Sequence, residues 1–393
     1  MAFPRISHRM ALLFALLAVL CSGLYSFPQT AEDSVGQSQG ASSTSIGGYG
    51  NVLYQRAATA GVSTLDMQRV VLFVGHSFNS NVAFFSELEM EDAKVSGGED
   101  GGEIAFEQAY VRFALDRNHY LTAGLFLPRI GILNEDHLPT SFYGNERTQV
   151  ETFILPSTWR ELGIGLYGNL NRIPLTYSVG LVNGLNSSAF EHGSGIREGR
   201  FEGRNASANN LALTGSVQWL ADGLKAQLSG YYGGTVGLTT HDADSLQLNG
   251  GLFGTPVSIG EADVQYEARG LRVRMLGTIV SIPDAFAINR AYGNNTPQSE
   301  FGAYIEAGYD LLHRPGATDT EALIPFVRYE ILDMNATIPG NAVSDPSLAQ
   351  SHIVVGLNYL PIPGVVMKGD VRFVTTKASG SETFFNAGLG FSF

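Results

Sequence analysis

Apolar and polar residues alternate along most of the chain from about residue 46 onward. In residues 271–279, apolar side chains at the odd positions alternate with Arg272, Arg274 and Thr278. A helix would spread these charges around its whole circumference, whereas a strand places them on one face. Residues 365–373 repeat the pattern. Segments of about ten residues with this period are typical of strands that cross a bilayer at a tilt.

The links between these segments alternate in length, which favours one architecture. Short turns on one side and long loops on the other are characteristic of an outer-membrane barrel. Counting the segments predicts about sixteen antiparallel strands in a closed, all-β transmembrane barrel. The predicted short links are residues 79–81, 116–119, 171–174, 221–223, 269–270, 313–321 and 361–364, and the long ones are 57–66, 96–102, 128–160, 184–209, 233–254, 282–297, 335–350 and 376–382.

Composition agrees with a barrel whose strands face lipid on one side and water on the other. Only 16% of the residues are charged, less than the quarter or so that is usual in soluble domains. Beyond the first 26 residues, no apolar stretch approaches the length of about 18 residues that a membrane-spanning helix needs. A membrane protein without such helices has to close a sheet on itself to satisfy its backbone hydrogen bonds. The predicted barrel domain is residues 46–393.

The first residues are typical of a secretory signal. Residues 1–26 have a basic start followed by an apolar stretch at residues 10–20, which is too short to span a bilayer. An uncleaved anchor and a lipoprotein acylated at Cys21 are alternatives, but Leu20 is larger than the residue that normally precedes such a cysteine. We expect Sec-type export to the outer membrane, with residues 27–45 as a flexible polar segment.

Charge and cysteine content exclude several classes of function. The formal net charge of −13 argues against nucleic acid as a partner, because phosphate contacts need clustered lysine and arginine. Cys21 is the one cysteine and lies in the predicted signal. Cysteine-based metal sites, nucleophiles and disulfides are therefore not expected in the mature protein, and we expect no cofactor.

The last strand carries a predicted assembly signal. Alternate apolar residues run to the final aromatic, which resembles the terminal strand that the barrel-assembly machinery recognises in outer-membrane proteins. An ordinary edge strand would show the same alternation. The assignment to an outer-membrane barrel therefore depends on the pattern of long and short loops rather than on this strand alone. The residues are Phe385, Leu389, Phe391 and Phe393.

Three further segments carry a more particular resemblance. Residues 108–115 contain Ala-Tyr-Val, residues 120–131 contain Gly-Leu-Phe-Leu-Pro-Arg-Ile-Gly, and residues 159–168 contain Arg-Glu-Leu-Gly-Ile-Gly-Leu-Tyr-Gly. Together, over about residues 103–170, they resemble the phosphate-selective porin O/P family. The resemblance implies that loop 128–160 folds into the barrel and narrows it, and it makes a homotrimer plausible.

The charges of that loop depart from the family pattern, because acidic and basic residues are mixed where phosphate-selective members are basic. We therefore expect a porin with weak or no selectivity, through which small hydrophilic solutes or ions diffuse passively. We do not expect an enzyme. The candidate pore-lining or constriction residues are Arg112, Arg129, Glu135, Asp136, Arg147, Glu151, Arg160, Arg272, Arg274, Arg328, Glu330, Lys368, Asp370 and Arg372.

Other interpretations stay open at this level. Each candidate charge could instead form a cross-strand ion pair in the barrel wall. The barrel could be plugged by its loops and serve as a structural or surface protein. An outer-membrane hydrolase would need an activated nucleophile. The one candidate is the pair Asp136 and His137, which could activate the hydroxyl of nearby Thr140 or Ser141. The alternating acids of residues 87–91 could bind calcium or form a solvated face, and no metal is expected.

Overall fold

Sixteen strands make up the computed structural model of the chain, which describes residues 42–93, 102–170, 172–315, 321–378 and 380–393. The predicted signal peptide, residues 1–26, lies outside the described residues, as does most of segment 27–45. The strands are β1 (Ser43–Ala57), β2 (Ser63–Ser77), β3 (Val82–Glu91), β4 (Ile104–Ala114), β5 (His119–Phe126), β6 (Glu161–Leu170), β7 (Leu175–Asn183), β8 (Leu211–Ala221), β9 (Leu224–Gly233), β10 (Val257–Ala268), β11 (Leu271–Ser281), β12 (Ser299–Tyr309), β13 (Ala322–Thr337), β14 (Ala349–Ile362), β15 (Val365–Thr376) and β16 (Ser381–Ser392).

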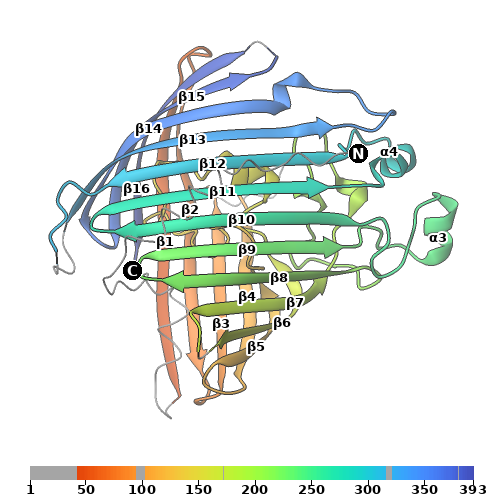
Figure 1. Ribbon diagram of the computed structural model, residues 1–393, viewed down its shortest axis with the longest axis horizontal. Coiled ribbons are helices and arrows are strands. Elements are labelled where there is room, and N and C mark those ends of the chain that lie inside the picture. The colour runs from red at the N-terminus through yellow and green to blue at the C-terminus, as the bar shows by residue number, and fades with distance from the viewer. Residues whose placement is uncertain (1–41, 94–101, 171, 316–320, 379) are drawn as a thin grey trace.

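Every strand pairs antiparallel with its neighbour in the chain, and β1 pairs with β16 to close the barrel (Figure 1). In the closing pair, Gly50 lies opposite Phe391. The strand count, the antiparallel order and the closure confirm the predicted fold class. Strand β1 begins at Ser43, three residues before the predicted start of the barrel, because Ser43 pairs with Ser77 of β2.

The connections keep the predicted alternation of short and long over most of the barrel. The links between β1 and β2 (58–62) and between β15 and β16 (377–380), predicted to be long, are short, and the link between β12 and β13 (310–321) is longer than predicted. One short link is the turn between β10 and β11, where Arg269 and Gly270 have φ angles of 52° and 81°. Two consecutive left-handed residues form the type I′ turn whose twist matches a two-residue hairpin. At the opposite end, the links include residues 127–160 between β5 and β6 and residues 184–210 between β7 and β8.

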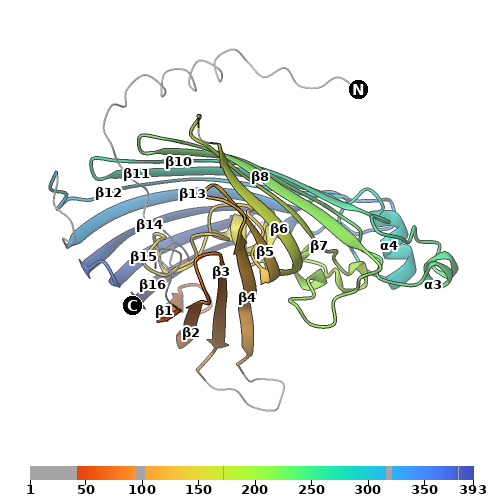
Figure 2. The same cartoon turned by 90° about the horizontal axis from the view of Figure 1, so that it is seen from below.

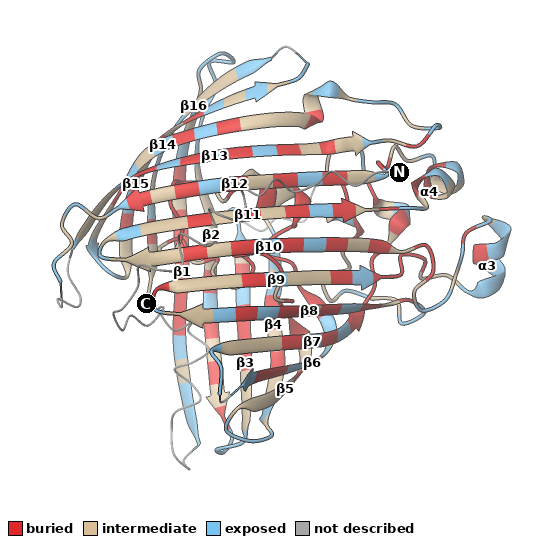
Figure 3. Cartoon of the chain, viewed as in Figure 1, coloured by how far each residue is buried: buried red, intermediate tan, exposed pale blue. Residues whose placement is uncertain are grey.

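Buried and more exposed residues alternate along many of the strands (Figure 3), because successive side chains of a strand point to opposite faces of the wall. In β14, Ile353 and Val355 point outward and are about half exposed, whereas His352 and Asn358 point inward and are buried. The neighbouring strand β15 repeats this arrangement, with Met367 and Phe373 outside and charged residues inside. The outer surface is thus a broad apolar belt and the inner surface is polar.

The helices are short and lie in the links. No helix among the described residues is long and apolar enough to cross a membrane. Two α-helices lie at the long-loop end, in the links after β9 and β11 (Figure 1). The helical segments are the π-helix η1 (Val150–Ile154), the 3-10 helices η2 (Ser187–Ala189), η3 (Arg197–Gly199) and η4 (Pro346–Leu348), and the α-helices α3 (Thr240–Ser245) and α4 (Ala285–Tyr292).

Candidate functional site: a constriction formed by the inward loop

The link between β5 and β6, residues 127–160, lies inside the barrel (Figure 2). It reaches strand β15 on the far wall, where Lys368 Nζ donates a hydrogen bond to the backbone carbonyl of Phe142 at 2.9 Å. Asn145 donates to Asp370 through both its backbone N–H, at 2.8 Å, and its side-chain amide, at 2.6 Å. This inward path is the one that the family resemblance implies. We call residues 127–160 the constriction loop.

Strand β13 supplies a second anchor for the constriction loop through a buried charge cluster. Arg328 forms ion pairs with Glu306 of β12 at 3.2 Å and with Glu330 at 2.9 Å. The same guanidinium donates to the carbonyl oxygens of Tyr143 and Glu146. Glu330 in turn accepts the backbone N–H of the loop residue before η1, at 2.6 Å. Arg328 and Glu330 therefore hold the loop rather than face open water.

A carboxylate inside the constriction loop holds its two arms together. Glu151 accepts the backbone N–H groups of Ile132 and Leu133, each at 2.7 Å, and the hydroxyl of Tyr304 at 2.7 Å. Burial raises the pKa of Glu151 to about 7, although these donors act in the opposite direction. Because Glu151 has no exposed surface, it braces the loop and does not line a pore, in contrast to the prediction for this residue.

Strands β9 and β11 bind the start of the loop through opposite charges. Glu135 forms ion pairs with Arg129 at 2.5 Å and with Lys225 at 3.2 Å. Burial opposes ionisation of Glu135, yet these two cations bring its pKa to about 2. Asp136 pairs with Arg274 at 3.1 Å. These residues therefore attach the loop to the wall, and they differ from the alternative interpretation in that the pairs do not join two strands.

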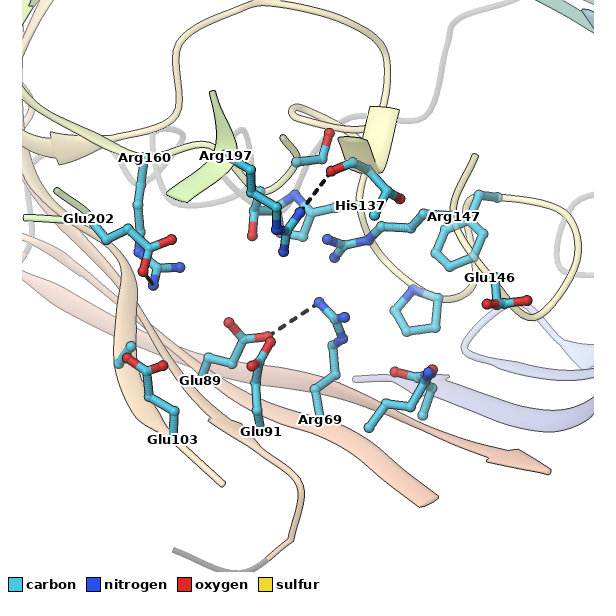
Figure 4. A pocket seen from close by; sticks show the side chains of 18 of the residues that line it. Arg69, Glu89, Glu91, Glu103, His137, Glu146, Arg147, Arg160, Arg197 and Glu202 are labelled. Atoms are coloured by element: carbon cyan, nitrogen blue, oxygen red, sulfur yellow. Dashed lines mark hydrogen bonds and ion pairs between the residues drawn. The ribbon is translucent and has the colours of Figure 1, made fainter. Parts of the chain in front are cut away.

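Between the constriction loop and strands β1–β4, a polar cavity of about 350 Å³ remains. Its barrel side carries Glu89, Glu91 and Glu103, with Arg69 paired to Glu89 at 3.3 Å. Arg147 faces these carboxylates from the loop (Figure 4). We call this opening the eyelet. Five arginines and six glutamates line it: Arg69, Arg147, Arg160, Arg197 and Arg200, and Glu89, Glu91, Glu103, Glu146, Glu198 and Glu202.

The link between β7 and β8 forms the rim of the eyelet on the long-loop side. Glu202 pairs with Arg160 at 3.0 Å and with Arg200 at 2.9 Å. Arg197 of η3 donates to the carbonyl of Thr152 in η1, at 2.8 Å. These contacts join the second long link to the constriction loop, so one rim carries charges of both signs.

A second cavity, of about 320 Å³, lies at the short-turn end. Tyr143 lines this cavity, whereas Phe142 lines the eyelet. Two consecutive aromatic residues of the constriction loop therefore reach different cavities. The turn of Arg269 and Gly270 and the side chains of Glu267 and Arg272 contribute to the second cavity.

The predicted charges fall into two groups in the structure. Arg147 and Arg160 line the eyelet. Arg272 donates to the carbonyl of Ser141, and Arg372 pairs with loop residue Glu146 at 3.1 Å, so both attach the loop. Arg112 belongs to neither group and lies over the rings of Phe85 and Tyr120. The other attachment residues are Arg129, Glu135, Asp136, Glu151, Arg274, Arg328, Glu330, Lys368 and Asp370.

Several eyelet residues are not among those predicted from the sequence. Arg69 lies in β2 between Gln68 and the continuous apolar run of residues 70–74, so no period of two marks the face on which it lies. Arg197, Arg200 and Glu202 lie in an irregular link that has no period to read. Glu89 and Glu91 were recognised as one strand face, and the structure places both at the eyelet.

The residues proposed for a hydrolase are engaged elsewhere. Asp136 pairs with Arg274, and Ser141 Oγ donates to the backbone carbonyls of Asp136 and Leu138. His137 faces Glu87 and Glu107. These side chains therefore do not form a chain from carboxylate through imidazole to hydroxyl, which a triad requires.

The closed, sixteen-stranded antiparallel barrel matches the fold of solved outer-membrane porins over most of the chain. The channel DcaP of Acinetobacter baumannii superposes with a TM-score of 0.57 at 11% identity, covering 90% of this chain and 97% of that one. OmpF of Salmonella typhi, solved with daunomycin, gives 0.57 at 12% identity, with 89% and 97% covered. An anion-selective porin of Comamonas acidovorans gives 0.54 at 14% identity, with 90% and 100% covered. At these identities the likeness concerns the fold.

The chain belongs to the same family as an uncharacterized protein of Aquifex aeolicus strain VF5. The two are 30% identical over 363 residues, which cover 89% of this chain and 80% of that protein. No family model matches the chain, so the resemblance to phosphate-selective porins stays a prediction.

Proposed function

We propose that the protein is an outer-membrane porin through which small hydrophilic solutes or ions diffuse passively. The eyelet carries this proposal, because it is a polar cavity between an inward loop and a barrel wall. A barrel of about sixteen strands is too wide for its own side chains to fill, and here the constriction loop takes up much of the remaining space. The long-loop end would face outward and the short turns the periplasm.

The charges of the eyelet favour weak ion selectivity. Six carboxylates and five guanidinium groups line it, and several are already paired with one another. Selectivity in such pores depends on the field of the charges at the narrowest point. Because the charges are nearly balanced, we expect similar permeabilities for cations and anions. Phosphate selectivity would need a mainly basic constriction, and the eyelet is not mainly basic.

Single-channel recording in a planar bilayer tests the proposal. The mature chain, refolded in detergent, should give steady conductance steps, and a salt gradient across the bilayer should give a reversal potential close to zero. A folded barrel that produces no steps would contradict the porin and support the plugged structural barrel. Heat-modifiable migration on a gel identifies the folded form, so a silent bilayer cannot be confused with failed folding.

The apolar outer belt leads to a separate prediction about the membrane. Val355 lies on the outer face between Val327 of β13 and Val371 of β15. Replacing it with arginine should lower the free energy of unfolding in lipid vesicles by about 2–4 kcal/mol, as for charges facing the middle of a bilayer. Chemical unfolding followed by tryptophan fluorescence measures the loss.

Val62 provides the matched control for this substitution. It is exposed in the link between β1 and β2, away from the belt. Val62→Arg should change the free energy of unfolding by less than about 0.5 kcal/mol. Equal effects at the two positions would show that the outer belt does not face lipid. The recognition of the last strand by the assembly machinery and the association into a homotrimer stay predictions.

A further inference from the structure

Beside the eyelet, three buried side chains from separate elements converge. Glu87 of β3, Glu107 of β4 and His137 of the constriction loop each present an oxygen or nitrogen atom, and these atoms all lie within 4.8 Å of one another. His137 Nε2 lies 3.6 Å from Glu87 Oε2 and 3.8 Å from Glu107 Oε2. Less than a tenth of each residue is exposed. The cluster is the point where the loop meets the β3–β4 wall.

The imidazole of His137 is oriented by its other nitrogen. Nδ1 lies 3.4 Å from the carbonyl oxygen of Asn134, which can only accept a hydrogen bond, so Nδ1 carries a proton. In the neutral ring, Nε2 then points a lone pair at two carboxylates. Both distances exceed hydrogen-bond reach, and Nε2 has no hydrogen-bond partner. Two carboxylates facing this lone pair repel it and one another, and a proton on Nε2, a proton on one carboxylate or a metal ion between the three atoms would relieve the repulsion.

We propose that Glu87, Glu107 and His137 bind a divalent transition-metal ion of the Zn²⁺ type. A tetrahedral ion with bonds of about 2.1 Å holds its ligand atoms about 3.4 Å apart, a few tenths of an ångström less than the separations from Nε2. One imidazole with two carboxylates suits Zn²⁺ better than Ca²⁺, which takes oxygen ligands. The fourth position would be left to water from the eyelet.

Outer contacts hold the two carboxylates in place, as they do around known metal ligands. Glu107 accepts the hydroxyl of Tyr49 at 2.6 Å and that of Thr158 at 2.5 Å. Glu87 accepts the side-chain amide of Gln108 at 3.2 Å. These donors fix the orientation of the carboxylates before a metal arrives, so little rearrangement is needed on binding.

The charge around the cluster also leaves room for a cation. Arg69 and Arg147 both act electrostatically on Glu107, and Arg69 is also paired with Glu89. The three carboxylates of Glu87, Glu89 and Glu107 against these two arginines give a local charge of about −1 with neutral His137. A bound ion would bridge the loop to β3 and β4 and hold one edge of the eyelet.

Titration calorimetry on the folded, chelator-treated protein tests this site, with Zn²⁺ as the probe and no histidine tag on the chain. We expect one Zn²⁺ per chain, with Ca²⁺ failing to displace it. His137→Asn and Glu87→Gln should each weaken binding at least about tenfold, and Tyr49→Phe should weaken it about tenfold through loss of the outer hydrogen bond. The matched controls His352→Asn and Glu261→Gln change buried inner-wall residues outside the cluster and should bind as the parent does.

The outcomes separate the metal from the proton. Wild-type protein that takes up no Zn²⁺ would overturn the proposal and leave a proton-held ion triad. Binding that survives His137→Asn, or that Ca²⁺ replaces equally well, would also overturn it, since the imidazole would not be a ligand. If a variant fails to fold, Co²⁺ loading of the wild type decides instead. A visible absorption band that Zn²⁺ removes supports the site, and its absence contradicts it.

Discussion

Replacing residues 135–149 of the constriction loop with a four-residue Gly-Ser linker is expected to raise the single-channel conductance about twofold or more. The deletion can close without strain, because Glu151 accepts hydrogen bonds from Ile132 and Leu133 and so holds the two ends of the removed segment near each other. Asn134, which bonds to the backbone of Trp159, is retained. The removed segment contains Phe142, which lines the eyelet, and Tyr143, which lines the second cavity, so the shortened barrel would have a wider passage.

Shortening another link supplies the control for this experiment. Residues 340–344 lie in the link between β13 and β14 at the long-loop end and are largely exposed. Replacing them with Gly-Ser should leave the conductance unchanged. If both deletions changed the conductance equally, or if neither did, the current would not pass the constriction loop. A parent that is silent and a deletion variant that conducts would identify the plugged barrel.

The second large effect is expected at Arg328, whose replacement by methionine should lower the free energy of unfolding by about 3–5 kcal/mol. Arg328 is 2% exposed, Glu306 is 3% exposed, and Glu330 is fully buried. Removing the guanidinium leaves two carboxylates without their cation and removes the hydrogen bonds to the carbonyls of Tyr143 and Glu146. The loss arises mainly from those stranded charges, and chemical unfolding in lipid or detergent measures it.

Two further variants isolate the charge effect. In the double variant Arg328→Met with Glu330→Gln, one stranded charge is neutralised while the acceptor for the Gln149 N–H is kept, so part of the stability should return. Arg56→Met, at an exposed position of β1, should change the free energy of unfolding by less than about 0.5 kcal/mol. A loss below about 1 kcal/mol for Arg328→Met would mean that lumen water hydrates the cluster.

Strands and turns could be predicted from the sequence because their signals are local. The alternation in residues 271–279 depends on neighbours two positions apart. The short link at Arg269 and Gly270 is a two-residue turn whose left-handed backbone angles depend on these residues alone. Each period-two segment therefore predicted one strand, and the count of sixteen followed. Lumen-facing residues such as Arg328 and Lys368 were found by the same reasoning.

The roles of those residues were decided only by the tertiary structure. Lys368 contacts Phe142, and Arg328 contacts Tyr143, across more than 180 positions of the chain. No local pattern links such pairs, because an irregular loop has no period and its path depends on which wall groups satisfy its backbone.

The eyelet and the proposed metal site show the same division. Glu87 could be assigned to the inner face of its strand from alternation alone, but its proximity to Glu107 and His137 required the loop to fold inward. The sequence by itself determined a closed sheet with one apolar and one polar face, because backbone pairing in lipid permits little else. The tertiary structure decided which polar residues hold the loop and which line the eyelet, because that choice depends on burial and on partners distant in the chain.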